Sequence, residues 1–392
     1  MILFKAIWYF IQIYFGIHLI FPVLLFLHAK LRGTDRLENK QPVDENNPDY
    51  GIIITAYQQL HQIPDVVASV LSSNYNNYMI YVVADNCDIS ELNIQNDKVL
   101  VLRPPTVLGA NVRSHFYAIY NFVRAHSHIV IVDSDNIVDS NFLTVVNRYI
   151  KAGFNAVQGV RAAKNTNTVL ARLDAARDIY YHYYDGKLLY TAGSSATLAG
   201  SGMAFSLKLF KDCLENRDVT GAGFDKVLQH AILSKNERIA FAEEAIVWDE
   251  KTAQSDQLVN QRARWINTWF RYFSKGFGLI WHGLVGFDLN KFLFGIVLIR
   301  PPLFILLIAS FVLLVLNVFF VPVQGLLWFF GLLFFIFGFM LSLWLNHTDP
   351  KIYKALISIP SFIFYQLKSL LLVRKANKVS VATKHSTQED RK

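Results

Sequence analysis

The chain has only two cysteines in 392 residues, Cys87 and Cys213, and they do not have the spacing of metal ligands. We interpret both as ordinary reduced thiols. The sequence also lacks a Gly-x-Gly-x-x-Gly turn after a strand and a P-loop, which disfavours the dinucleotide-binding and NTPase classes. No internal repeat or low-complexity segment is evident. The remaining evidence is the distribution of apolar residues and the placement of acidic ones.

Apolar residues make up 53% of the chain, and they are unevenly distributed. They crowd the first thirty positions and the stretch after about residue 290, while the middle alternates polar and apolar residues as globular domains do. This distribution predicts one soluble domain, residues 49–274, between two membrane regions.

The N-terminal segment 6–27 is about as long as a bilayer-spanning helix, and its strongly polar members are Gln12 and His18. We therefore predict a transmembrane anchor over residues 1–28. A cleaved signal peptide is the alternative. It is disfavoured because the apolar run is long for such a peptide and no small-residue cleavage motif follows it.

Two further apolar runs, 303–320 and 325–345, are separated by uncharged residues and predict a transmembrane hairpin over 303–345. The preceding stretch, 275–302, is apolar but interrupted by polar residues, which favours a helix lying in the membrane interface.

The last part of the chain is apolar but carries more polar residues. Residues 346–373 include Gln366 and Lys368 and predict a second interfacial helix, with a further crossing as the alternative. A basic tail, 374–392, ends the chain.

Basic residues set the expected orientation. Several follow the anchor in the predicted linker 29–48, whereas only Lys5 precedes the anchor, and the hairpin loop has none. We therefore expect a multi-pass protein of the cell (inner) membrane with its central domain in the cytoplasm. The net charge of +8 suits anionic lipid headgroups as partners, and we expect no nucleic-acid binding.

The central domain alternates short β-branched runs with stretches of helical spacing, which predicts an α/β domain with a mainly parallel sheet. The runs are 51–55, 79–84, 99–102 and 129–132, and the helical stretches include 63–73 and 113–125. In such sheets ligands bind beyond the carboxyl ends of the strands. The acidic residues after these strands are therefore the candidate site.

Two of those acidic residues, Asp133 and Asp135, lie one residue apart at a strand end. Alternation directs both side chains to the same side, where they suit a hard divalent cation and, through it, a diphosphate. The alternative is a plain strand-to-loop turn in which the carboxylates cap backbone amides. On this short motif alone, that alternative is favoured.

Two single carboxylates have similar alternatives. Asp85 follows a strand and suits hydrogen bonding to a nucleotide base or ribose, or it ends the strand in an Asx turn. Asp225 precedes the helical stretch 227–233, and on this position alone a helix cap or first-turn carboxylate at the positive end of the helix is favoured.

On a predicted helix, Gln261, Arg264 and Trp265 share one face, and an amide, a guanidinium and an indole there suit phosphate binding and sugar stacking. The alternative is an amphipathic helix with its tryptophan at the membrane interface. The aromatic group 180–184 suits an acceptor groove, although core packing is the favoured account.

In this order, these pieces resemble the family 2 glycosyltransferases, particularly the membrane-bound synthases of cellulose, chitin, hyaluronan and poly-N-acetylglucosamine. The resemblance covers about residues 50–270. The matching segments are 54–57, 82–87, 132–135, 199–205, the Asp225 segment, 248–251 and the Gln-x-x-Arg-Trp motif at 261–265.

The resemblance implies a GT-A fold, a hexosyltransferase activity and an inverting displacement at the anomeric carbon. On the donor side it implies that Thr55, Tyr57 and Asp85 bind the nucleotide of a UDP-sugar. It further implies that Asp133 and Asp135 hold Mg²⁺ or Mn²⁺, with Asp133 also close to the nucleotide.

On the acceptor side the resemblance implies that Asp225 is the general base. Gln261 and Arg264 would stabilise the leaving diphosphate, and Trp265 would stack on the acceptor sugar. The resemblance also places Gly202 among these leaving-group and acceptor residues. The chain departs from the family where Phe224 replaces the usual glutamate before the base.

We therefore expect sugar transfer from a UDP-sugar to a saccharide or membrane-associated acceptor, in polysaccharide or glycoconjugate synthesis. Three crossings are few for a polysaccharide channel, which favours single sugar transfers, or export through oligomers or through export or accessory subunits as partners. A polyprenyl-phosphate or lipid glycosyltransferase is the enzymatic alternative. A membrane scaffold that retains the nucleotide-sugar fold is the non-enzymatic one.

Overall fold

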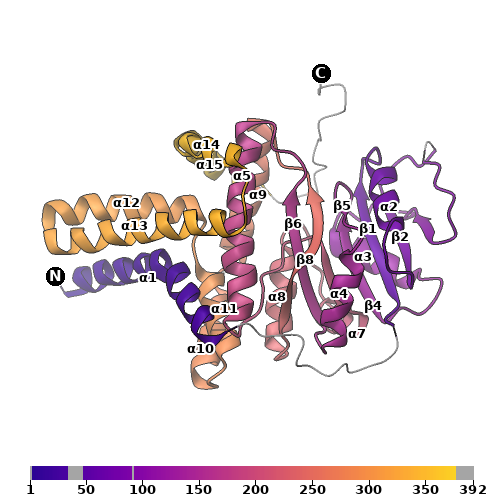
Figure 1. Cartoon of the computed structure of the whole chain (residues 1–392), viewed down its shortest axis with the longest axis horizontal. Coiled ribbons are helices and arrows are strands. Elements are labelled where there is room, and N and C mark those ends of the chain that lie inside the picture. Colours follow the sequence, from indigo (N-terminus) through magenta and orange to yellow (C-terminus); the bar gives the residue numbers. More distant parts are fainter. Residues whose placement is uncertain (1, 34–46, 91, 377–392) are drawn as a thin grey trace.

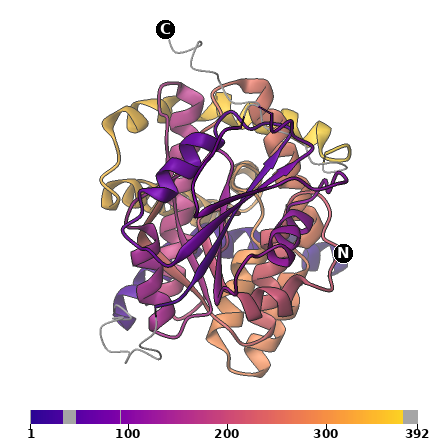
Figure 2. The ribbon, with the colours of Figure 1, turned by 90° about the vertical axis from the view of Figure 1, so that its right-hand side faces the viewer.

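The computed structural model describes residues 2–33, 47–90 and 92–376. Most of the predicted linker 29–48 and of the predicted basic tail 374–392 lies outside the described residues. Figure 1 shows a sheet-containing domain from which long helices project to one side, and Figure 2 shows the domain from the sheet end.

Eight strands form one sheet in the order β3-β2-β1-β4-β7-β6-β8-β5. Their bounds are β1 (Tyr50–Tyr57), β2 (Tyr78–Asp85), β3 (Val99–Leu102), β4 (His128–Asp133), β5 (Ile137–Val138), β6 (Ala156–Ala163), β7 (Met203–Ser206) and β8 (Ile239–Asp249). The four strands from β3 to β4 run parallel, as do β6 and β8, whereas β7 and β5 run antiparallel to their neighbours. The α/β prediction is confirmed, with a mixed sheet.

The four parallel strands β1 to β4 coincide with the four predicted runs, each to within two residues. The apolar β-branched residues of β1, β2 and β4 are buried on both faces, as parallel strands require, whereas the edge strand β3 is half-buried. The antiparallel strands β5 and β7 span two and four residues. Neither strand was among the predicted runs, and both are compatible with the predicted mainly parallel sheet.

Helices cover both faces of the sheet and continue toward the projecting end (Figure 1). Those of the sheet domain are α2 (Ile63–Leu71), α3 (Asn111–Tyr120), α4 (Phe142–Lys151), α5 (Val169–Tyr181), the π-helix η2 (His182–Leu188), α6 (Leu189–Thr191), α7 (Leu207–Leu214), α8 (Phe224–Ser234) and α9 (Ser255–Tyr272). Those of the projecting part are α1 (Ile2–Arg32), α10 (Lys275–Val285), α11 (Leu289–Ile299), α12 (Leu303–Phe320), α13 (Pro322–Leu345), α14 (Pro350–Ala355), the 3-10 helix η3 (Leu356–Ser358) and α15 (Ile359–Leu372).

The register of the parallel strands brings the candidate site residues together. Tyr57 pairs with Asp85 of β2, and Thr55 pairs with Asp133 of β4. The carboxyl ends of three strands therefore meet at one edge of the sheet, as the sequence predicted.

Four helical segments of the described residues are long and apolar enough to cross a membrane: α1, α12, α13 and the continuous stretch 350–372. In Figure 1, α1, α12 and α13 run alongside one another away from the sheet, whereas α14 and α15 are seen nearly end-on. Residues 350–372 therefore lie across the direction of the other three. This orientation is the one expected of a helix in the membrane interface, the predicted place for this segment.

Residues 275–302 form two helices rather than the single interfacial helix that was predicted. Asp288 ends the turn between α10 and α11, and its carboxylate caps α11 by accepting from the Lys291 amide at 3.1 Å. The two helices pack closely. A Cβ added to Gly283 would lie 2.5 Å from the Phe292 nitrogen. The polar residues that interrupt this segment therefore mark a helix boundary.

Candidate active site

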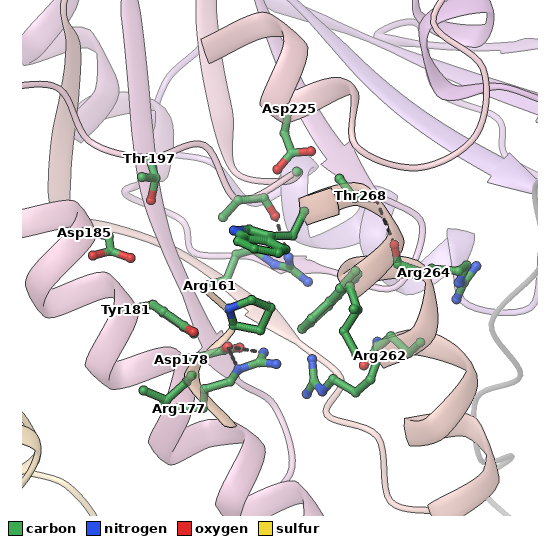
Figure 3. Close-up of a pocket in the computed structure, with 18 of the residues that line it drawn as sticks. Arg161, Arg177, Asp178, Tyr181, Asp185, Thr197, Asp225, Arg262, Arg264 and Thr268 are labelled. Atoms are coloured by element: carbon green, nitrogen blue, oxygen red, sulfur yellow. Dashed lines mark hydrogen bonds and ion pairs between the residues drawn. The ribbon is translucent and has the colours of Figure 1, made fainter. Parts of the chain in front are cut away.

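A cavity of about 1050 Å³ opens at the carboxyl ends of the strands and continues between α12, α13 and α15. Figure 3 shows some of the residues that line it. Many of the site residues expected from the sequence line it. They are Thr55, Tyr57, Asp133, Asp135, Asp225, Gln261, Arg264 and Trp265. The structure thus brings together residues that are more than 200 positions apart in the sequence.

Asp85 does not line the cavity, because its carboxylate is directed into the loop beside it. Its two oxygens accept hydrogen bonds from the amides of Leu108 (2.9 Å) and Gly109 (2.8 Å), and the residue is 2% exposed. Asp85 thereby fixes the loop that leads into α3. The predicted contact of Asp85 with a nucleotide base remains a prediction.

Gly202 also lies outside the cavity lining and has a backbone role. Its φ of +64° is in the left-handed region, and a Cβ there would lie 2.9 Å from a methyl group of Val247. Its amide donates to the Ile131 carbonyl at 3.0 Å, and its own carbonyl accepts from Gly159 at 2.9 Å. Glycine is therefore needed here for close backbone packing between β4 and β6.

The carboxylate of Asp133 lies among other negative charges. Burial raises its pKa to about 7, and the charges of Asp135, Asp249 and Asp225 contribute, while Arg161 acts in the opposite direction. Such a group is poorly neutralised by the protein alone. A divalent cation beside it would remove the repulsion.

Two neighbouring carboxylates are held in place by one amide. The Asn136 side chain donates to Asp135 at 2.8 Å and to Asp249 at 3.1 Å. No group of three or more carboxylate, histidine or cysteine side chains among the described residues is arranged to enclose a metal by itself. The donor set of Asp133 and Asp135 instead suits a cation such as Mg²⁺, which binds one or two carboxylates and completes its shell with substrate phosphates and water.

Asp225 lies in the first turn of α8 and points into the cavity (Figure 3). The turn before it uses Gly223, whose φ of +99° favours glycine and whose Cβ would lie 2.4 Å from a Thr268 methyl group. This close approach brings the start of α8 against α9. Lys226 pairs with the Asp225 carboxylate at 3.1 Å. The predicted position of Asp225 at the start of a helix is confirmed.

The Gln-x-x-Arg-Trp motif lies on α9, as predicted, and all three motif side chains line the cavity. The ring of Trp265 is 39% exposed and is approached by the guanidinium groups of Arg262 (4.0 Å) and Arg177 (4.5 Å). Burial lowers the pKa of Arg264. The ring that was predicted to stack on a sugar is therefore already packed against two cations.

Residues 48–268, more than half of the chain, match the family model described as "Glycosyltransferase like family 2". The chain belongs to this family. The fold is similar to that of the mannosyltransferase PcManGT from Pyrobaculum calidifontis in complex with GDP-Man and Mn²⁺. That match has 14% identity and a TM-score of 0.58 and covers 93% of this chain and 98% of that one.

A second structure with some likeness to this family 2 glycosyltransferase is TarS 1-349 from S. aureus in complex with UDP-GlcNAc. It is 12% identical over 63% of this chain and 90% of its own, with a TM-score of 0.39. No curated protein matches the chain. Family and fold together identify a hexosyltransferase enzyme with a GT-A-like domain.

The family 2 glycosyltransferase also contains a line of buried and partly buried ion pairs along the cavity wall that was not anticipated as a unit. We call it the charge chain. It runs Arg161, Asp249, Lys251, Asp178, Arg177, Asp174, Arg262. Cations and carboxylates alternate along it, and the Lys251 ammonium bridges Asp178 (2.5 Å) and Asp249 (2.7 Å).

Only part of the charge chain was visible in the sequence. The segment 248–251, with Asp249 and Lys251, was among the matching pieces. Asp174, Arg177 and Asp178 follow the three-and-four spacing of one helix face, a signal available in the sequence. Their partners are Lys251, just after β8, and Arg262 on α9, and these pairings could not be inferred without the fold.

The aromatic group 180–184 divides between the core and the cavity. Tyr180, Tyr183 and Tyr184 are at most 5% exposed and belong to the core, as favoured from the sequence. Tyr181 and His182 line the cavity.

The π-helix that follows connects the catalytic domain to the projecting helices. Asp185 of η2 accepts two hydrogen bonds from Arg300, one of them at 2.9 Å, and both residues are buried. The Trp269 indole donates to the Arg300 carbonyl at 2.7 Å. The start of α12 is thus fixed to both the π-helix and the motif helix α9.

Beyond Arg300, the walls of the cavity become apolar. They include Leu303, Phe304 and Leu307 of α12, Leu332, Phe335, Ile336, Phe339 and Met340 of α13, and Ile359, Phe362 and Ile363 of α15. The cavity therefore has a charged end at the sheet and an apolar end between helices that are long and apolar enough to enter a membrane.

Proposed function

We propose that this family 2 glycosyltransferase transfers a sugar from a UDP-sugar to a membrane-associated acceptor, with inversion to a β-linkage. The observation that carries the proposal is the continuity of one cavity. It joins the carboxylates Asp133 and Asp225 to apolar walls on α12, α13 and α15. A water-soluble donor and an acceptor held in the membrane therefore have access to the same reacting groups.

The donor belongs at the sheet end of the cavity. Thr55 and Tyr57 line the wall beside the strand ends, where a nucleotide is expected in such sheets. Asp133 and Asp135 would hold Mg²⁺ or Mn²⁺, which when bound neutralises the charge that develops on the leaving diphosphate. The structure of PcManGT with GDP-Man and Mn²⁺ supports the use of a divalent cation.

The acceptor hydroxyl belongs beside Asp225. As its oxygen bonds to the anomeric carbon, the bond from that carbon to the diphosphate breaks, and Asp225 accepts the hydroxyl proton. Arg264 and Gln261 would stabilise the leaving nucleoside diphosphate by hydrogen bonding.

We also propose a multi-pass arrangement in the cell (inner) membrane with the catalytic domain on the cytoplasmic side, where nucleotide sugars are made. The product would enter polysaccharide or glycoconjugate synthesis, with export or accessory subunits as partners. Transfer to a polyprenyl phosphate or another lipid is the second candidate, and the apolar end of the cavity favours it. A scaffold without activity is disfavoured because Asp133, Asp135 and Asp225 are all present.

The test is Mn²⁺-dependent release of nucleoside diphosphate from a panel of UDP- and GDP-sugars by the detergent-purified chain. We expect release from one donor, lost on chelation and in Asp133→Asn. Asp212→Asn is the matched control, because Asp212 is an exposed residue of α7 paired with Lys208. The absence of both nucleotide release and nucleotide binding across the panel would overturn the proposed function.

A further inference from the structure

Arg262, at one end of the charge chain, is a buried cation with unused hydrogen-bond donors. It is 2% exposed and lines the cavity. Its Nη2 atom donates to Asp174, but Nε and Nη1 have no hydrogen-bond partner among the described residues. Leaving a buried N–H group unpaired is costly, and more so when the group is charged. These two donors therefore point to a ligand.

The charges around Arg262 favour an anion as that ligand. The charge chain begins and ends with arginine. Arg161 at one end faces both Asp249 and Asp133, whereas Arg262 at the other end is ion-paired with Asp174 and lies near the cation Arg177. Burial and the charge of Arg177 lower the pKa of Arg262 to about 10, although Asp174 and Asp178 act in the opposite direction. A bound anion would complete the neutralisation.

The neighbours of Arg262 connect this cationic position to the apolar end of the cavity. Leu173 of α5 and Leu258 of α9 pack with Phe362 of α15, and Ala176 of α5 packs with Leu343 of α13. The helices that carry the charge chain therefore lie directly against the apolar ones. Figure 3 shows Arg262 and Asp225 on opposite sides of the drawn pocket.

We propose that Arg262 binds a phosphate group of a lipid acceptor, with the apolar chain of that lipid lying between α12, α13 and α15. The head beyond the phosphate carries the hydroxyl group that reaches Asp225. The inference rests on the proposed function, because it names the acceptor class of the same site. It identifies that class as a lipid in which a phosphate links an apolar chain to a hydroxylated head. Arg262 is then the residue that selects it.

The volume of the cavity is large enough for a donor and part of an acceptor to bind together. Single ligand pockets span roughly 300–1,000 Å³, and this cavity measures about 1050 Å³ with a charged end and an apolar end. A donor at the strand ends thus leaves the apolar end for a chain.

Binding of farnesyl phosphate to the detergent-purified full chain, measured by isothermal titration without nucleotide, tests the inference. Farnesol and inorganic phosphate are the matched ligands. We expect farnesyl phosphate to bind at least tenfold more tightly than either. Arg262→Gln should weaken its binding at least tenfold, and Arg262→Lys should restore part of it. Arg271→Gln is the control variant and should bind normally, because Arg271 is an exposed residue of the same helix outside the cavity.

A second variant keeps the test decisive if Arg262→Gln does not fold. Leu332→Trp should fill the apolar end of the cavity and weaken farnesyl phosphate binding about tenfold, with unchanged nucleotide binding. Equal binding of farnesyl phosphate and farnesol would overturn the inference, and so would binding of inorganic phosphate as tight as that of the lipid. If Arg262→Gln weakened the binding of nucleoside diphosphate and left lipid binding normal, Arg262 would belong to the donor site. That result would also overturn the inference.

The two proposals fail separately. Donor turnover by a protein that does not discriminate the lipid phosphate would reject this inference and leave the proposed function standing. Selective lipid phosphate binding by a protein that neither binds nor hydrolyses any nucleotide sugar would reject the proposed function, and the acceptor assignment with it.

Discussion

Two groups of carboxylates face the same cavity in opposite electrostatic settings. At the strand ends, Asp133 lies beside Asp135 and Asp225, and burial with these like charges raises its pKa to about 7. In the charge chain, burial alone would raise the pKa of Asp178, but Arg177 and Lys251 hold it well below its usual range. Arg161 and Lys251 likewise keep the pKa of Asp249 low.

The difference separates groups that the fold itself neutralises from groups that require a ligand. The charge of a carboxylate between two cations is neutralised before any substrate binds, so the charge chain belongs to the stable structure of the folded protein. The carboxylates at the strand ends repel one another until a cation, a donor or a proton arrives. The exception within the charge chain is Arg262, whose donors are not all used.

Asp225→Asn tests the strand-end group and should have the largest effect. Loss of a general base lowers a rate by about 10²–10⁴-fold, so we expect that decrease in sugar transfer. Donor binding should change less than twofold. The measurement is the steady-state rate of nucleoside diphosphate release together with the donor dissociation constant. A variant that transfers sugar at the wild-type rate would show that Asp225 is a structural first-turn carboxylate.

Lys251→Met tests the charge chain, and its expected effect is on stability. Lys251 is 2% exposed, and its removal leaves two buried carboxylates each with one cation fewer. Removing one partner of a buried ion pair destabilises by about 3 kcal/mol. We expect a decrease in Tm of roughly 6 to 12 °C in detergent.

The matched control for this variant is Lys187→Met. Lys187 is 43% exposed and pairs with the exposed Glu243 at 2.7 Å. Exposed pairs contribute about 0.2–1 kcal/mol, so the Tm should change by only a few degrees at most. Equal losses in the two variants would contradict the view that the charge chain is a buried framework.

Acid provides the third and smallest test, because the paired carboxylates should not respond between pH 7 and pH 5. The neighbouring cations hold the pKa values of Asp178 and Asp249 well below the usual range, so the contribution of these two carboxylates to stability is lost only below about pH 4. His115 responds earlier. Burial lowers its pKa from 6.5 to about 3, so over this range the unfolded state binds the proton and the folded state does not. The free energy of unfolding should then fall by about 2 kcal/mol for this residue between pH 7 and pH 5.

His115→Leu should remove that part of the acid response. The His115 ring packs against Phe210 and Phe224, and its Nδ1 atom has no partner among the described residues, so an apolar side chain suits the position. Urea unfolding at pH 7 and pH 5 measures the difference. The same pH dependence in the variant and the wild type would show that other groups cause the acid loss.

The sequence was most informative where local patterns determine the structure. The β-branched runs of β1, β2 and β4 ended at the right places because apolar residues give way to Tyr57, Asp85 and Asp133 at the strand ends. Because these strands are parallel neighbours, residues at their carboxyl ends were expected to lie close together at one edge of the sheet. The family resemblance supplied the expected roles of Asp225 on α8 and of the Gln-x-x-Arg-Trp motif on α9. These roles depend on contacts between distant segments, which no local pattern contains.

The sequence was least informative where a residue acts through distant backbone or through several elements. Gly202 was grouped with the acceptor residues, but its left-handed backbone and its contact with Val247 account for it. Arg262 occupies a variable position of the Gln-x-x-Arg-Trp motif, and the sequence assigned it no role. Its partner Asp174 is 88 residues away on α5, and only the fold shows that two of its donors are unused.

A few polar contacts of α1 set the order in which the molecule is completed during synthesis. Gln12 donates to Gln324 at 3.1 Å, across 312 residues of sequence, and its side-chain oxygen accepts from Trp328 and Asn317. Translation at about 5 to 20 residues per second therefore separates the emergence of α1 from that of its partners by roughly 15 to 60 s. α1 is thus made well before α12 and α13, and its polar contacts are completed only when those two helices emerge.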